Sequence, residues 1–141
     1  VDCARGAVRQ RLAPPQGRHF NGHGTFLAEG RVLATSEQDA ETSEGLVGLW
    51  DVEAGFRRMG EAPTGGIGPH DLRRLPDGRA IVANGGIATD PTDRTKLNLV
   101  TMRPNLAIVD PLGDGLAEVA ELDPALRRLS IRHLALRQDG T

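Results

Sequence analysis

A histidine recurs at the start of one repeated phrase, and this repeat constrains the fold more than any other feature of the sequence. His23 opens HGTFLAEGR, His70 opens HDLRRLPDGR and His133 opens HLALRQDGT, each with a glycine turn shortly after it. The interval between the first two histidines matches the period of a four-stranded propeller blade, roughly 40–50 residues, and the second interval is longer. The chain is therefore expected to consist of repeated blades.

Short apolar runs separated by turn residues predict the strands of these blades. The chain has 18 glycines and 9 prolines, and no segment keeps a helical period over several turns, so the predicted fold class is all-β. Four runs follow one another in each repeat, which is the content of one antiparallel blade. In the first repeat they are the run from 23 to the turn at 29–30, then 31–35, 45–51 and 56–60; in the second they are 71–75, 79–84, 106–110 and 117–122.

These runs divide the chain into four parts. Residues 1–22 are interpreted as the last strands of a preceding blade and a linker, 23–69 and 70–132 as complete blades, and 133–141 as the first strand of the next blade. An inserted loop at 85–105 accounts for the greater length of the second blade, and loops of this length are usually functional. Because a closed propeller ring takes roughly four to eight blades, we expect the chain to be a segment of a longer propeller.

Composition excludes several classes of partner. The formal net charge is −2, with 17 basic and 19 acidic residues and no basic block, so nucleic acid is not an expected partner. No apolar run is long enough for a membrane-spanning helix, so we expect no membrane insertion. The sequence also lacks a Gly-x-Ser-x-Gly elbow and a phosphate-binding loop, so nothing in it supports nucleophilic catalysis.

The repeated histidines are the best candidate site. The first strand of each propeller blade lines the central channel, so His23, His70 and His133 are expected around one mouth of that channel. Three neutral imidazoles there would suit iron, copper or zinc. The alternative is that each histidine hydrogen-bonds the backbone of a neighbouring blade and holds the ring together. His19 could join them only through a curled loop, because four extended residues span about 13 Å.

An anionic ligand is a second possibility for this face. Arg132 precedes His133, and its planar guanidinium suits a carboxylate or phosphate; the alternative is an ion pair between blades. Glu37, Asp71 and Asn84 lie at strand ends or blade starts near the same face, where they could balance Arg132 or add oxygen ligands.

The inserted loop adds two more candidate residues. If residues 85–105 fold over the channel, Lys96 and Arg103 could contact an anionic ligand. The alternative is that the apolar residues of this loop pack it on the neighbouring blade as a structural clasp.

Several longer phrases carry a family resemblance: GRHFNGHGTF at 17–26, GGIGPHDLRRLPDGR at 65–79, KLNLVTMRPNL at 96–106 and LSIRHLAL at 129–136. Together they resemble the bacterial domain-of-unknown-function 1513 family, over nearly the whole chain. The resemblance implies an exported, seven-bladed propeller of the WD40/YVTN-like type. It also implies a periplasmic location and genes neighbouring those of imelysin-like and haem proteins of iron uptake.

Three functions follow as hypotheses. The first is a non-catalytic periplasmic propeller that binds a ligand or metal, or acts as a scaffold, and is linked to iron acquisition with imelysin-like or haem-containing partners. The second is a protein-interaction scaffold whose channel is purely structural. The third is a lactonase-like hydrolase, which rests on analogy between folds.

Overall fold

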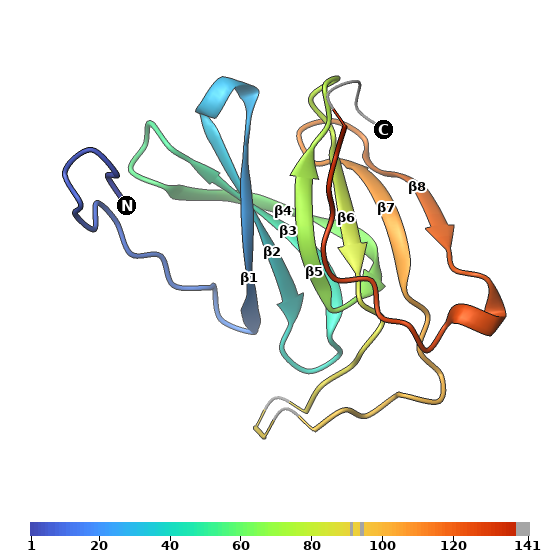
Figure 1. The fold of residues 1–141 in the computed structure, drawn as a ribbon. Helices are drawn as coiled ribbons and strands as arrows, with labels where there is room; N and C mark the ends of the chain where they lie inside the picture. Colours follow the sequence, from blue (N-terminus) through green and yellow to red (C-terminus); the bar gives the residue numbers. More distant parts are fainter. Residues whose placement is uncertain (91, 94, 138–141) are drawn as a thin grey trace.

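We analysed a computed structural model, which describes residues 1–90, 92–93 and 95–137. Two four-stranded antiparallel sheets follow one another along the chain, and within each sheet the strands lie in sequence order (Figure 1). The first sheet contains β1 (Arg18–Leu27), β2 (Val32–Asp39), β3 (Glu44–Asp51) and β4 (Arg57–Ile67). The second contains β5 (Pro69–Arg74), β6 (Ala80–Asn84), β7 (Asn105–Asp110) and β8 (Gly115–Glu121).

The all-β class is confirmed, because the described residues contain no α-helix. Two single turns of 3-10 helix occur, η1 (Ala28–Gly30) after β1 and η2 (Pro124–Leu126) after β8. No helical segment in the described part of the chain has the length and apolar character needed to cross a membrane. The predicted inserted loop lies between β6 and β7.

The ends of the chain differ from the expected strand pattern. β1 begins at Arg18, so residues 18–22, which were assigned to a linker, form part of the first sheet. Before them, the only pairing among residues 1–17 is a bridge between Asp2 and Ala7. Residues 131–137 are extended but pair with no strand, and residues 138–141 lie outside the described residues. The assignment of 133–141 to a further blade stays a prediction.

A single apolar core joins the two sheets. Alternate residues of β2 and β3 point into it, as expected for strands with one buried face. β5, β6 and β7 contribute to the same cluster from the second sheet. Full burial of a valine or leucine contributes about 1.5–3 kcal/mol, so this cluster is the main stabilising contact between the sheets. Its buried members are Leu27, Val32, Ala34, Val47, Leu49, Ala62, Leu72, Val82, Ala107 and Val109.

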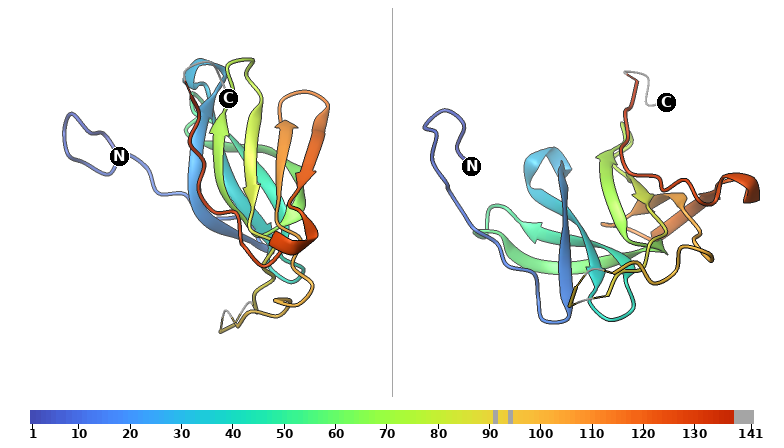
Figure 2. Two further views of the ribbon diagram at one scale, coloured as in Figure 1. Left: turned by 45° about the vertical axis from the view of Figure 1, so that its right-hand side comes forward. Right: turned by 60° about the horizontal axis from the view of Figure 1, so that its bottom comes forward.

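The first strands of the two sheets lie side by side. β1 contacts β5 along much of its length, and the side-chain amide of Asn21 donates a hydrogen bond of 2.8 Å to the carbonyl of Pro69. The extended segment after η2 runs back along β5, as the red trace shows in Figures 1 and 2. β1, β5 and this segment therefore bring residues far apart in the sequence to one face.

Candidate metal centre

The three repeated histidines meet on this face. His23 lies in β1, His70 in β5 and His133 in the extended segment 131–137. Their ring centroids are 4.9 Å apart for His23 and His70, 5.0 Å for His70 and His133, and 5.6 Å for His23 and His133. One nitrogen from each ring can be chosen so that all three atoms lie within 4.8 Å of one another.

Local irregularities in the strands position the first two histidines. The register between β1 and β2 shifts between Phe20 and Gly24, which brackets His23, and the register between β5 and β6 shifts across His70. At the first irregularity, Ser36 replaces strand pairing: its hydroxyl donates to the His23 carbonyl at 3.1 Å and accepts from the His23 N–H at 3.3 Å. Bulges of this kind redirect side chains and are common beside functional sites.

Two hydrogen bonds hold the segment that carries His133. The backbone N–H of Leu134 donates to Asp71 Oδ2 at 3.0 Å. The hydroxyl of Ser130 donates to the carbonyl of Gly85 at 2.8 Å. His133 therefore lies between two anchoring points on the second sheet, although its side chain is exposed and the segment belongs to no sheet.

Asp71 is the buried acid of the cluster. Its side chain is 1% exposed, and Oδ2 accepts hydrogen bonds from Leu134 and from the guanidinium of Arg73 at 3.1 Å. Oδ1 lies 3.4 Å from His23 Nδ1 but makes no hydrogen bond. Unpartnered buried oxygens are rare and costly. A small rotation of the His23 ring would let Nδ1–H donate to this oxygen and leave Nε2 free to bind a ligand.

The electrostatic environment favours neutral imidazole at His70. Burial lowers the pKa of this ring below its ordinary value, and the positive charge of Arg132 and the two other histidines lower it further, against an opposing effect of Asp71. Neutral imidazole is the form that binds metal ions. The site is therefore suited to a cation held by nitrogen ligands.

A cavity of about 430 Å³ opens beside His70. Arg132 and Lys96 line it, so the structure brings together two of the cations that sequence reasoning singled out. Asn21 and Gln38 also line this cavity, and neither was singled out in the sequence. No sequence signal marks them, because their position depends on how β1 and β2 curve beside β5.

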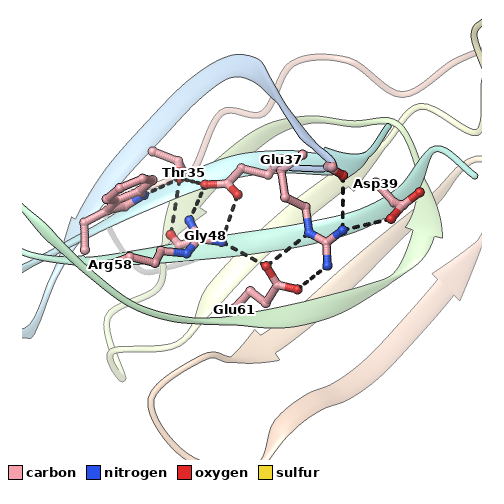
Figure 3. A network of polar contacts seen from close by, with 9 residues as sticks. Thr35, Glu37, Asp39, Gly48, Arg58 and Glu61 are labelled. Carbon is pink, nitrogen blue, oxygen red and sulfur yellow. Dashed lines mark hydrogen bonds and ion pairs between the residues drawn. The ribbon is translucent and has the colours of Figure 1, made fainter. Parts of the chain in front are cut away.

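Glu37 lies elsewhere, in a saturated polar network on the first sheet (Figure 3). Its carboxylate is fully buried and accepts two hydrogen bonds from Arg58, at 2.6 and 2.9 Å, and a third from the Thr35 hydroxyl. The Trp50 indole donates to Thr35 at 2.9 Å, and the Arg58 guanidinium lies 4.8 Å from the Trp50 ring. This carboxylate is fully occupied, and it does not belong to the histidine cluster.

The same network continues to the surface through Arg18. Its guanidinium contacts Glu61 at 2.6 Å and Asp39 at 2.8 Å, and Glu61 also pairs with Arg58 at 3.0 Å. Hydrogen bonding to Arg18 lowers the pKa of the Glu61 carboxyl. Alternating charges thus tie β1, β2 and β4 together.

Asn84 links the two sheets. Its amide donates to the carbonyl of Thr64 at 3.0 Å and to Asn105 Oδ1 at 2.7 Å, while its own oxygen accepts from the Thr64 hydroxyl at 2.7 Å. The side chain is fully buried. A Cβ at Gly66 would lie 2.5 Å from the Asn84 amide carbon, so only glycine permits this approach. Asn84 therefore has a structural position away from the cluster.

Two other candidates lie apart from the three histidines. Arg103 is exposed and lines other cavities, one shared with Leu99 and Arg128. His19 is exposed on β1 and does not belong to the three-histidine group.

Comparison with known proteins places the whole chain in one family. No curated protein and no solved structure gave a significant match. A family model described as "Protein of unknown function (DUF1513)" matches residues 1–141. The chain therefore belongs to the DUF1513 family of proteins of unknown function.

Proposed function

We propose that this chain forms part of a non-catalytic β-propeller that binds a transition-metal ion through His23, His70 and His133. The observation that carries the proposal is the convergence of three ring nitrogens within 4.8 Å beside a buried carboxylate oxygen that makes no hydrogen bond. Metal-bound histidines almost always donate their second N–H to a carboxylate, carbonyl or water. Asp71 offers such an acceptor to His23.

The spacing of the nitrogens fits a metal ion after a small movement. Ligands at about 2.0–2.1 Å from a tetrahedral zinc ion lie roughly 3.3 Å from one another. The three nitrogens therefore need to close by about 1.5 Å at most, and each belongs to a ring that can rotate about its side-chain bonds. His133 is the most mobile candidate, because its segment makes no strand pairing.

The ligand set favours particular metals. Three imidazoles suit zinc, copper, nickel and iron, and affinity for the divalent ions rises from ferrous iron to copper and then falls at zinc. We therefore expect copper and zinc to bind more tightly than ferrous iron. Three protein ligands leave a further coordination position open.

A propeller architecture agrees with this site. Each sheet has four antiparallel strands in sequence order, and the first strands of both sheets lie side by side. We propose that they are consecutive blades. Closure of a ring, the exported location and a link to iron uptake are parts of the same proposal, and they draw their support from the family resemblance.

The test is a metal titration of the full protein by calorimetry with zinc, cupric and ferrous ions, the last under anaerobic conditions. We expect one tight site, with the affinity reduced at least about 100-fold in His70→Ala or His23→Ala. His19→Ala is the matched control, because it removes an exposed histidine of the same strand and is expected to leave the affinity unchanged. Equal binding by wild type and His70→Ala would overturn the proposal.

A structural role for the histidines is the second candidate, since their rings already join three segments without a metal. It predicts that His70→Ala destabilises the metal-free protein and that the wild type binds no metal. Urea unfolding of the same variants, in the presence of a chelator, separates the two candidates.

A further inference from the structure

The cavity beside the three-histidine centre has a charge that the centre alone does not explain. His70 belongs to both the centre and the cavity wall, so the two adjoin. Arg132 and Lys96 line the cavity, and no aspartate or glutamate lines it. Its volume, about 430 Å³, is in the range of sites for small organic molecules, roughly 300–1,000 Å³.

The two cations also lack acidic partners elsewhere. Among the residues that the structure describes, neither Arg132 nor Lys96 forms an ion pair, whereas Arg18 and Arg58 each contact two carboxylates. The ion pair between blades that the sequence suggested for Arg132 is thus not seen among these residues. A cavity with two unpaired cations and no acid attracts an anion.

The chemistry of the proposed metal centre points to the same kind of ligand. Three neutral imidazoles leave the full double charge of a divalent ion in place, together with an open coordination position. A carboxylate oxygen would fill that position. The planar fork of arginine binds a second carboxylate in a bidentate manner.

We propose that the cavity binds a small organic dicarboxylate, with one carboxylate on the metal beside His70 and the other paired with Arg132 and Lys96. This inference rests on the proposed metal centre. Polar groups of Asn21 and Gln38 on the cavity wall are available to hydrogen-bond the body of the ligand. The site distinguishes dicarboxylates from monocarboxylates, because only the former reach both ends.

The experiment is a calorimetric titration of the zinc-loaded full protein with succinate, with acetate and inorganic phosphate as comparison ligands. Protein is kept in excess over zinc, so that succinate does not meet free metal. We expect succinate to bind at least about 10-fold more tightly than acetate. Arg132→Ala should lower succinate affinity at least about 10-fold and Lys96→Ala by a smaller factor, while zinc affinity stays unchanged in both variants.

Arg103→Ala is the matched control, because it removes an exposed cation of the same inserted loop that lines other cavities. Equal succinate binding by wild type and Arg132→Ala, with zinc binding intact, would overturn the inference and leave the metal centre standing. Tighter binding of phosphate than of succinate would also overturn it. Absence of zinc binding in the wild type would overturn both proposals together.

Discussion

Two polar clusters of this chain, one around Glu37 and one around Asp71, differ in whether the buried acid is satisfied. Glu37 accepts hydrogen bonds from Arg58 and Thr35 on both of its oxygens. Asp71 is equally buried, but one of its oxygens makes no hydrogen bond and lies beside His23. A buried acid whose contacts are complete stabilises the fold, whereas one with an unused acceptor beside a histidine cluster is suited to orient a ligand.

Removing the partner of Glu37 gives the largest expected effect on this comparison. Arg58→Ala leaves a fully buried carboxylate without its cation, and such a change costs about 3–5 kcal/mol. Urea unfolding of the wild type and the variant measures the difference in the free energy of unfolding. Arg57→Ala, at the neighbouring exposed position, is the control and should change stability by less than about 0.5 kcal/mol. A loss below about 1 kcal/mol in Arg58→Ala would show that Glu37 is not held as we describe.

Zinc should stabilise the histidine cluster and leave the Glu37 network out of the effect. At a free zinc concentration of about 100 times Kd, the free energy of unfolding should rise by about 2.7 kcal/mol. Thermal or urea unfolding with and without zinc measures this rise. It should vanish in His70→Ala and persist in Arg57→Ala; a rise of the same size in both variants would place the metal elsewhere.

Neutralising Asp71 is expected to have a smaller effect. Asp71→Asn keeps the shape of the side chain but removes the negative charge beside His23 Nδ1. Loss of such a partner lowers metal affinity about 10–100-fold. Calorimetry with zinc measures the change, and Asp77→Asn, at an exposed turn, is the control. Unchanged affinity in Asp71→Asn would mean that this acid does not orient the ring.

The smallest effect concerns protonation of the metal-free protein. Burial and the charge of Arg132 lower the pKa of His70 below 6.5. The unfolded chain therefore binds a proton at this position before the folded chain does. Stability is lost as pH falls from the unfolded pKa to the folded pKa, and is unaffected at higher pH. NMR titration of the His70 ring gives the pKa directly, with His19 as an internal comparison; a value above 6.5 would contradict the described environment.

The repeat in the sequence predicts the four-strand pattern, because apolar runs and turn glycines follow the period of the strands. It also singles out the three histidines that the structure brings together. The start of β1 at Arg18 was missed, since the irregularity around Gly22 breaks the alternation that defines a strand. The absence of strand pairing at 131–137 depends on which chain segments lie beside it, and the local sequence carries no such information.

The position of Glu37 was also beyond the sequence pattern, although one signal existed. Its partner Arg58 lies two strands away, and β3 runs between them with Gly48 at the crossing. A Cβ at Gly48 would lie 1.8 Å from Glu37 Oε1 and 2.2 Å from Arg58 Nη1. Glycine inside a strand often marks close approach of other groups, so Gly48 between charged neighbours could have indicated an ion pair across the strand.

X-ray absorption at the zinc edge of the zinc-loaded full protein tests the central claim most directly. We predict three imidazole nitrogens at about 2.0–2.1 Å with one further light ligand, and the loss of one imidazole in His133→Ala. A first shell made of oxygen ligands without the outer scattering of imidazole rings would contradict a metal centre formed by His23, His70 and His133.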